Sequence, residues 1–555
     1  MNGSELLMEL LLEQGADLVF GYPGSAVLHI YDALYKYSDR IRHVMTAHEQ
    51  GAAHAADGYA RLTGKTGVVF ATSGPGATNL VTGIAAAYMD SVPMVAITGS
   101  VDTKLIGRDS FQEVYIAGIT LPITKHNFVV RHIGELAPVV RAAFRIAQEG
   151  RKGPVLVDIP KDITCALCEY RPPVGAAFLP PGVFVCAAGG KNAAPTDTLS
   201  QAAQALNAAS QPLILFGGGV QASNAGEQLR ALCAKGDIPA AHTLMAAGVL
   251  GCGEPHNLGL AGMHGNHSAN RAIQEANALL IIGSRLSDRV AGDFTRFAPK
   301  AIKIHIDIDA AELGKNVAVD IPLEGDAGAV LTQLLPLIEE KNRPAWQAKI
   351  AQWQEQDYKP TDDTASLKPH QIMQTIGALA GENAIYATDV GQHQIWAAQY
   401  AQRLKPRGFL TSGGLGAMGY GYGAAIGAGF AANGRPVIHI TGDGSLHMNM
   451  NEACTAVSYN VPVITVIFNN QALGMVRQWQ GAYFEKRYSS TSPERHTDYL
   501  KLAEGFGLRG FRCSTLEQFE EAFTQALALD APCWIECLIG KDEQVLPMHC
   551  AEGGD

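Results

Sequence analysis

The residues of this chain best suited to chemistry lie in two short motifs separated by a predicted helix. Gly442-Asp443-Gly444 follows one apolar run, and Asn469-Asn470 follows the next. This order predicts a strand, a glycine turn, a helix and a second strand, with both motifs at the carboxyl ends of parallel strands. Carboxylate and amide oxygens there suit a hard divalent cation that takes phosphate oxygens as its other ligands. The glycines allow backbone N–H groups to approach a diphosphate at the helix start.

The simpler alternative is a glycine turn and a capping asparagine in an ordinary Rossmann-like sheet. If the Gly-Asp-Gly turn were the only evidence, this alternative would be the better interpretation. The asparagine pair behind a second apolar run favours the metal and diphosphate site.

Length and composition restrict the class of protein. The 555 residues suffice for about three or four domains. The net charge of −11 is spread along the chain without a basic block, so we expect neither nucleic acid nor membrane as a partner. No apolar run is long enough to span a bilayer. The scattered cysteines and the absence of a basic leader predict a cytoplasmic protein.

Two stretches of altered composition divide the chain into three segments. A proline-rich and then Ala/Gly-rich stretch runs from Tyr170 to Thr198, and a charged one from Lys341 to Pro369. Each segment alternates apolar runs with helical patterns. We therefore predict an α/β fold of three doubly wound parallel-sheet domains. The expected domains are residues 1–170, 190–340 and 365–555.

The first and third segments share one pattern. Ser73-Gly74-Pro75-Gly76 and Gly442-Asp443-Gly444 each follow an apolar run and precede a helix, a Val-Pro pair and another apolar run. This suggests a duplicated unit in which one copy has the metal ligands. The alternative, that all βαβ units resemble one another, is equally compatible with the pattern.

Glu49 begins an alanine-rich predicted helix in the first segment. The alanines predict close packing against another helix or a flat surface. An acid in such an apolar helix needs a partner or a task. Its local sequence fits a first-turn acid that interacts with the helix dipole. Glu49 lies, however, in the copy of the unit that lacks the metal ligands. This position favours a role in binding a ligand that the first and third segments hold between them.

The chain resembles the acetohydroxyacid synthase (acetolactate synthase) catalytic-subunit family of thiamine-diphosphate enzymes. The matching motifs of the first segment are Gly21-Tyr22-Pro23-Gly24, the Glu49 helix, SGPGATN from Ser73, Phe111-Gln112-Glu113, Thr124-Lys125-His126 and GPVLVDIPKDI. Those of the third are Val390 to Gln394, Ser412 to Met418 and Gly442 to Trp479.

The resemblance implies a carboligase. Pyruvate would be decarboxylated and its two-carbon unit joined to pyruvate or 2-oxobutyrate, giving 2-acetolactate or 2-aceto-2-hydroxybutyrate in branched-chain amino acid biosynthesis. Glu49 would control proton exchange on the aminopyrimidine, Gln112 would lie near the reacting carbonyl, and Lys125 would line the channel. A homodimer or tetramer with active sites at the subunit interface is implied, and a regulatory small subunit is left open.

The resemblance also assigns the binding residues. Mg²⁺ would be bound by Asp443, Asn470 and the carbonyl of Ala472. Thiamine diphosphate would contact Pro23, Gly24, Gln392, His393, Gly416, Met418, Gly444, Ser445 and Met475. The substrate residues would be Phe111, Arg289, Val476 and Trp479. A structural FAD would contact Gly217, Gly218, Thr243, Leu244, Met263, His264, Gly283, Arg285, Asp307, Ile308 and Asp326.

Some alternatives stay open. A central domain that binds no flavin would fit a catabolic acetolactate synthase, and a pyruvate oxidase would cycle its FAD. A non-catalytic scaffold is disfavoured by the intact Glu49, Asp443 and Asn470. Gly414, Gly416 and Gly419 form a formal dinucleotide fingerprint, but no acid follows at the expected distance, so a cofactor-lining turn is the better interpretation.

Three departures from the family pattern are expected to matter. Ser25 replaces a glycine, which would be costly if that position needs a positive φ. Leu286-Ser287-Asp288 replaces a more acidic triplet, which weakens the assignments of Arg289 and the flavin. The C-terminal stretch from Val545 lacks the family's usual proline-glycine tail, so the sequence does not predict closure over the site.

Overall fold

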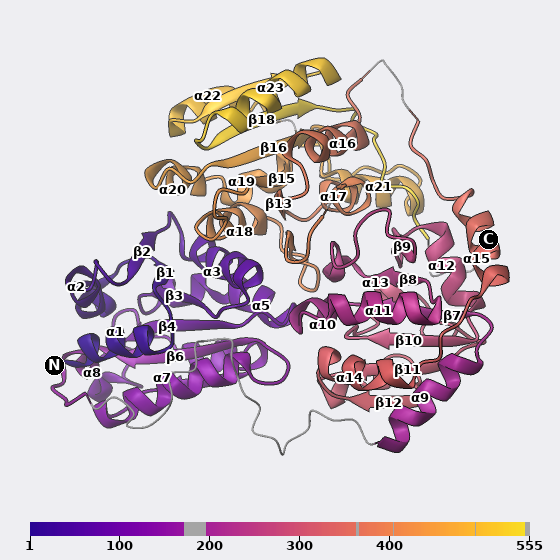
Figure 1. Cartoon of the computed structure of the whole chain (residues 1–555). Helices are drawn as coiled ribbons and strands as arrows, with labels where there is room; N and C mark the ends of the chain where they lie inside the picture. The colour runs from indigo at the N-terminus through magenta and orange to yellow at the C-terminus, as the bar shows by residue number, and fades with distance from the viewer. Residues whose placement is uncertain (171–195, 362–365, 403, 494, 550–555) are drawn as a thin grey trace.

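The computed structural model describes residues 1–170, 196–361, 366–402, 404–493 and 495–549. These residues form three α/β units, each built on six parallel strands, as predicted. Figure 1 shows the N-terminal unit in indigo to purple, the central unit in magenta and the C-terminal unit in orange to yellow, meeting at a common junction. Most of the first predicted linker lies outside the described residues.

The N-terminal unit has the strand order β2-β1-β3-β4-β6-β5. Its strands are β1 (Leu18–Gly21), β2 (Arg42–Met45), β3 (Gly67–Ala71), β4 (Met94–Ser100), β5 (His126–Val129) and β6 (Pro154–Pro160). One face packs on α1 (Gly3–Glu13), α2 (Leu28–Lys36) and α7 (Ile133–Gln148), and the other on α3 (Glu49–Thr63) and α5 (Val81–Met89). The shorter helices are α4 (Pro75–Asn79), α6 (Ile116–Thr120) and α8 (Lys161–Cys165).

The central unit has the order β12-β11-β10-β7-β8-β9, which is the strand order of dinucleotide-binding sheets. Its strands are β7 (Pro212–Phe216), β8 (Ala240–His242), β9 (Asn257–Leu260), β10 (Ala278–Ile282), β11 (Ile302–Asp307) and β12 (Ile321–Glu324). Its helices are α9 (Thr196–Ala208), α10 (Gly218–Ala222), α11 (Gly226–Gly236), α12 (His267–Glu275), α13 (Asp288–Ala291), α14 (Ala327–Leu334) and α15 (Pro344–Gln354).

The C-terminal unit has the order β14-β13-β15-β16-β18-β17, which repeats the order of the N-terminal unit. Its strands are β13 (Ile385–Thr388), β14 (Phe409–Thr411), β15 (Val437–Gly442), β16 (Val463–Asn469), β17 (Arg509–Cys513) and β18 (Cys533–Leu538). Its helices are α16 (Pro369–Ala380), α17 (Gln392–Tyr400), α18 (Tyr420–Gly429), α19 (Asp443–Asn449), α20 (Glu452–Ser458), α21 (Gly474–Tyr483), α22 (Tyr499–Phe506) and α23 (Leu516–Ala528). The shared order supports the duplicated unit.

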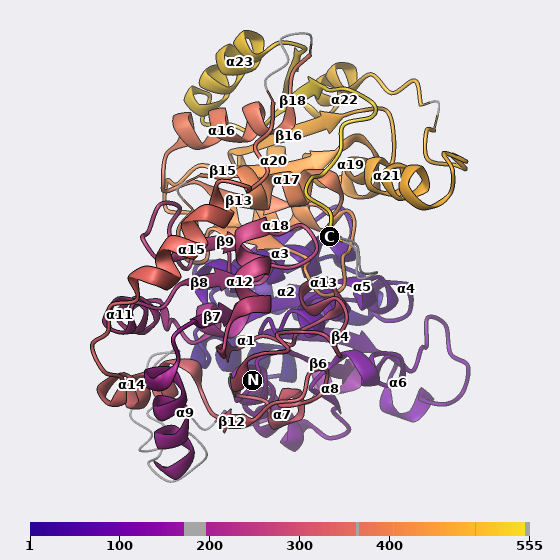
Figure 2. The same cartoon turned by 90° about the vertical axis from the view of Figure 1, so that its right-hand side faces the viewer.

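Helices α3 and α18 join the two outer units, and both views show them side by side at the boundary (Figures 1 and 2). A Cβ added to Gly427 would lie 1.9 Å from the backbone oxygen of Ala55, and one on Gly58 would lie 2.2 Å from that of Ala424. The small residues therefore allow the two backbones to touch. This confirms the close packing predicted from the alanines of α3.

Among the helices of the described residues, none has both the length and the apolar character needed to cross a membrane.

Candidate active site

The predicted metal ligands lie where the strand order of the C-terminal sheet reverses, beside the end of β15. Asp443 is the first residue of α19 and is 7% exposed, and burial raises the pKa of its carboxyl to about 6. Asn470 Oδ1 accepts the backbone N–H of Ala472 at 3.1 Å, which fixes the turn after β16. In the described part of the chain no three His, Cys, Asp or Glu side chains form a metal-binding group. A cation here would therefore take amide, carbonyl and phosphate oxygens besides Asp443.

Gln392 and His393 begin α17, directly after β13, at the same reversal point. Gln392 Oε1 accepts from Asn470 Nδ2 at 3.3 Å, so the two predicted ligand residues touch. His393 is 6% exposed, and burial lowers the pKa of its imidazole to about 4. Its Nε2 has no hydrogen-bond partner among the described residues. A buried polar atom of this kind fits a site that receives a polar ligand.

The turn that carries Met418 is tied to the start of α19. The N–H of Gly419 donates to Ser445 Oγ at 3.2 Å, and Asn449 Nδ2 donates to the carbonyl of Gly419 at 2.7 Å. Gly416, on the same turn, has a φ of +70°, which glycine adopts without strain. The structure therefore brings the predicted thiamine-diphosphate residues of the C-terminal unit together.

The N-terminal half of the predicted site gathers around the turn after β3. Thr72 is buried there, and its Oγ1 accepts the N–H of Ala26 at 3.3 Å, just beyond Pro23-Gly24. A Cβ on Gly24 would lie 2.5 Å from the Thr72 side chain, and one on Gly74 would lie 2.8 Å from the backbone oxygen of Gln112. The turn thus holds the Pro23 and Gln112 segments close together.

Glu49 lies against the same turn. Its side chain is buried, Oε2 accepts from Asn79 Nδ2 at 2.9 Å, and a Cβ on Gly76 would lie 3.1 Å from Oε1. Within the described chain no hydrogen bond or ion pair joins Glu49 to Asp443 or Asn470. The two halves therefore form separate clusters in one chain.

Ser25 causes no backbone strain. It begins a short 3₁₀ helix (Ser25–Val27) and is not among the residues with positive φ. The position therefore does not need glycine. Leu286 does have a positive φ, of 49°, and its carbonyl accepts from Asn316 Nδ2 at 3.2 Å.

A cavity of about 690 Å³ opens at the junction of the three units. All the predicted flavin residues except Gly217 line it. The predicted active-site residues Arg289, Gly416, Met475 and Trp479 line it as well. Its volume lies within the usual range of about 300–1,000 Å³ for ligand sites.

The glycines predicted to approach the flavin lie where the central sheet reverses its strand order. Gly283, with a φ of +56°, follows β10, and the N–H of Gly219 donates to its carbonyl at 3.0 Å. A Cβ on Gly219 would lie 2.6 Å from the Cα of Gly283. This is the position where such sheets bind dinucleotides.

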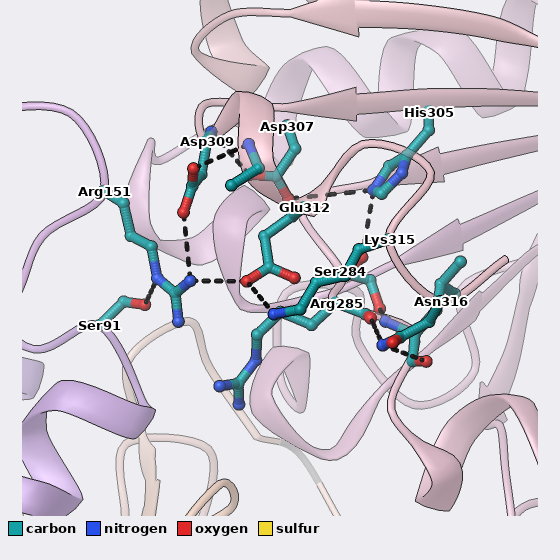
Figure 3. A network of polar contacts seen from close by, with 12 residues as sticks. Ser91, Arg151, Ser284, Arg285, His305, Asp307, Asp309, Glu312, Lys315 and Asn316 are labelled. Carbon is teal, nitrogen blue, oxygen red and sulfur yellow. Dashed lines mark hydrogen bonds and ion pairs between the residues drawn. The ribbon is translucent and has the colours of Figure 1, made fainter. Parts of the chain in front are cut away.

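Arg151 connects the N-terminal unit to the side of the cavity that the central unit lines (Figure 3). It donates from Nε to Ser91 Oγ at 2.9 Å and from Nη1 to Glu312 Oε1 at 2.8 Å and Asp309 Oδ2 at 3.2 Å. Glu312 is buried, and its Oε2 has no hydrogen-bond partner among the described residues. Burial also raises the pKa of the nearby Asp307 to about 6. Sequence reasoning missed Arg151 and Glu312, because their pairing depends on how two units pack.

Two substrate residues predicted from different units meet at the cavity. The Arg289 guanidinium lies over the indole of Trp479, 5.6 Å from its centroid, and Arg289 Nη1 lies 3.4 Å from Met263 Sδ. Such a cation–π contact is stabilising even when exposed. Arg289 therefore reaches the cavity with the altered triplet before it.

The other predicted substrate and catalytic residues lie elsewhere. Lys125 Nζ donates to the carbonyls of Ile146 and Glu149 at the end of α7, and burial lowers the pKa of this amine to about 8. Phe111 is 86% exposed and Val476 49% exposed. The described chain thus leaves these three outside its cavity.

Asp389 and Asp90 were missed by sequence reasoning. Asp389 is fully buried and accepts from the N–H of Gly421 and from Thr441 Oγ1, both at 2.6 Å. Asp90 accepts from the N–H groups of Gly413 and Gly414 at 3.0 and 2.7 Å, and so ties this turn of the C-terminal unit to the N-terminal unit. In the sequence, the only feature that could have indicated Asp389 or Asp90 is their position directly after or near an apolar run.

The segment after β18 binds α17 and α21 as an extended strap. Side chains on one face of α17 donate to its carbonyls: Gln392 to Glu543, Trp396 to Gln544 and Gln399 to Leu546. Farther along, the N–H of His549 donates to the carbonyl of Met263 at 2.7 Å. The described part of the predicted atypical tail therefore spans two units, and residues 550–555 lie outside the described chain.

Comparison with known proteins agrees with this arrangement. Three thiamine pyrophosphate enzyme models match: the N-terminal TPP binding domain over residues 1–119, the central domain over 199–334 and the C-terminal TPP binding domain over 389–537. The fold and the site therefore define a thiamine pyrophosphate enzyme.

Full-length relatives narrow the class. The chain is 44% identical to an acetolactate synthase of Mycobacterium bovis, over 99% of this chain and 90% of that protein. It is also 44% identical to a probable acetolactate synthase large subunit of Methanocaldococcus jannaschii, over 99% and 93% of the two chains. An acetolactate synthase large subunit of Corynebacterium glutamicum is 43% identical, over 99% and 89%. The chain belongs to the acetolactate synthase large-subunit family, which confirms the predicted resemblance.

Proposed function

We propose that this chain is the catalytic subunit of an acetolactate synthase that decarboxylates pyruvate and joins the two-carbon unit to a second 2-oxo acid. The observation that carries this proposal is the contact between Arg289 and Trp479 at the cavity, whose lining also includes Met475 and Gly416. A guanidinium suits the carboxylate of a 2-oxo acid, and the flat indole suits its short alkyl chain.

Thiamine diphosphate, when bound, supplies the electron sink for decarboxylation. Asp443, Asn470 and the carbonyl of Ala472 would hold Mg²⁺ against the diphosphate, and the partnerless Nε2 of His393 would face the same ligand. The donor set is all oxygen with one carboxylate, which fits Mg²⁺ better than a softer metal. Met418 would support the cofactor from its turn.

Glu49 would exchange a proton with the aminopyrimidine ring of the cofactor. Its carboxylate is buried and kept in place by Asn79. A carboxyl group held in a water-poor site is well suited to repeated proton transfer. Gln112, on the far side of the Ser73-Gly74-Pro75-Gly76 turn, would orient the reacting carbonyl.

The indole of Trp479 would favour 2-oxobutyrate over pyruvate through the extra methyl group. One methylene group discriminates by about 1–3 kcal/mol in an apolar pocket. The expected product is therefore 2-aceto-2-hydroxybutyrate as well as 2-acetolactate, as branched-chain amino acid biosynthesis requires.

FAD would fill the remainder of the cavity in a structural role. The close approach of Gly219 to Gly283 and the unpaired Oε2 of Glu312 fit a nucleotide with hydroxyl groups. The two clusters that hold Glu49 and Asp443 would be completed by a second chain in a homodimer or tetramer. The exposed apolar side chains of Phe111, Tyr115 and Leu121 support such an interface. The proposed location is the cytoplasm, and binding of a regulatory small subunit is left open.

The purified chain, given pyruvate, thiamine diphosphate, Mg²⁺ and FAD, tests the function directly. We expect acetolactate with one CO₂ released per acetolactate and no peroxide. Absence of acetolactate would refute the proposal, and peroxide equal to CO₂ would indicate a pyruvate oxidase. A flavin absorption spectrum in the purified protein would separate it from the flavin-independent enzyme.

A further inference from the structure

Glu452 holds the backbone in front of Glu49 from another unit of the chain. It begins α20 in the C-terminal unit, and its carboxyl is completely buried. Oε2 accepts the N–H of Ala47 at 3.2 Å, and Oε1 accepts the N–H of His48 at 3.1 Å. These two residues immediately precede Glu49, the first residue of α3.

The fit between this carboxyl and α3 is close. A Cβ on Gly51 would lie 2.0 Å from Glu452 Oε1, so a larger residue at position 51 would displace the carboxyl. Thr455 Oγ1 donates to Glu452 Oε2 at 2.7 Å. Asn451 Nδ2 lies 3.5 Å from Oε1, so four donors meet one buried acid, which offsets the cost of removing it from water.

The side chain of Glu49 is fixed separately, by Asn79 of its own unit. The backbone before Glu49 is fixed by Glu452, which lies on the helix that follows α19, and α19 begins with Asp443. A single short stretch of the C-terminal unit therefore carries the candidate metal ligand and holds the segment that carries the candidate proton-transfer residue.

We propose that Glu452 is a positioning residue that sets the location of the Glu49 carboxylate through Ala47 and His48. The inference rests on the role proposed above for Glu49. It assigns Glu452 no contact with substrate or cofactor.

The test is Glu452→Gln, which keeps the size of the side chain but leaves only one oxygen for two N–H groups. In the protein without added cofactor, hydrogen exchange of a peptide covering Met45 to Ala52 should become about tenfold faster. Exchange in β16 should not change. With cofactors added, kcat should fall about tenfold, with KM for pyruvate and the Kd for thiamine diphosphate within about twofold of wild type.

Two variants provide controls. Glu504→Gln removes an exposed acid from α22 of the same unit and should change neither measurement. Thr455→Val removes the hydroxyl donor to Glu452 without touching α3, and should raise exchange of the same peptide about threefold. It serves as the test if Glu452→Gln does not fold.

The outcomes separate the two proposals. Unchanged exchange of the Met45 to Ala52 peptide in the test variant overturns the inference. Faster exchange with unchanged kcat means that the contact exists but does not position Glu49, which also overturns it. If Glu49→Gln is fully active, the proposed function of Glu49 fails, and the exchange result still reports on the contact itself.

Discussion

The N-terminal and C-terminal units have the same strand order but place different chemistry at equivalent points. In both, the key residues follow the first and third strands, where the order of the sheet reverses. In the N-terminal unit these strands lead to Pro23-Gly24 and to the turn at Thr72; in the C-terminal unit they lead to Gln392-His393 and Asp443. One scaffold therefore carries the residues proposed for proton transfer in one copy and those proposed for a metal and diphosphate in the other.

The equivalent helices α3 and α18 of the two copies pack against each other. Each follows the second strand of its unit, and their glycines and alanines bring the backbones into contact. The comparison therefore predicts three kinds of effect. Substitutions in the site of the N-terminal unit should lower kcat, and those in the site of the C-terminal unit should weaken cofactor binding. Substitutions in the contact between α3 and α18 should lower the stability of the fold.

The largest effect is expected for Glu49→Gln. General acid–base groups contribute about 10²- to 10⁴-fold, so kcat should fall within that range while thiamine diphosphate still binds. Steady-state kinetics and cofactor titration measure the two quantities. Glu135→Gln is the matched control, because Glu135 is also a first-turn glutamate in the same unit. A fully active Glu49→Gln enzyme would show that Glu49 serves only the helix dipole.

Asp443→Asn should affect binding more than turnover. Loss of a carboxylate ligand should raise the Mg²⁺ concentration needed for half-maximal activity about 100-fold, with partial rescue by excess Mg²⁺. Activity measured against Mg²⁺ concentration gives the shift. Glu521→Gln, on the exposed face of α23, controls for the charge change. A normal Mg²⁺ requirement in Asp443→Asn would contradict the assignment of the metal site.

Gly427→Ala should destabilise the contact between the two copies. The added Cβ meets the backbone of Ala55, and overpacking of this kind costs about 1–3 kcal/mol. Thermal unfolding should show a lower Tm. In Gly505→Ala on α22 the Cβ meets nothing within 4 Å, so the better helix propensity of alanine should raise the Tm slightly. Equal Tm changes in the two variants would argue against a close-packed junction.

The smallest effect concerns a buried acid on the sixth strand of each copy. Asp158 on β6 accepts from Thr98 Oγ1 at 2.7 Å, and burial raises its pKa from 3.8 to about 7. Glu536 on β18 is instead paired with Arg512 Nε at 2.7 Å. A raised carboxyl pKa gives stability that is full below about pH 4 and is lost as the pH rises through about 7.

The Asp158→Asn variant has no carboxyl at this position and should not lose this stability as the pH rises. The difference between its Tm and that of wild type should therefore increase by a few degrees from pH 5 to pH 8. Differential scanning fluorimetry across that range measures the difference. Glu536→Gln removes an ion pair and should lower the Tm instead. A constant difference between Asp158→Asn and wild type at all pH values would show that Asp158 is not protonated in the folded protein.

The sequence allows predictions for residues whose position follows from their local pattern, and the roles given to these residues stay predictions. Asp443 and Asn470 each follow an apolar run, and the alanines of α3 directly indicate a close helix contact. The three parallel-sheet domains and the family followed from patterns of the same kind, and both are confirmed.

Residues whose role depends on packing between units were not predictable in this way. Asp90, Glu452 and Arg151 find their partners across unit boundaries, in segments far apart along the chain. The residues next to them in the sequence are typical of any helix end or loop and do not indicate these partners. Whether position 25 requires glycine also had to be decided from the structure, because the requirement depends on the backbone angle φ of Ser25.

The walls of the central cavity come from all three units, and this has a thermodynamic consequence. A ligand that fills it binds only when the three units are folded and docked, so its binding energy adds to the stability of the whole assembly. At a ligand concentration of 100 times Kd the gain is about 2.7 kcal/mol. Loading the cavity should therefore make units that would melt separately unfold in one cooperative transition.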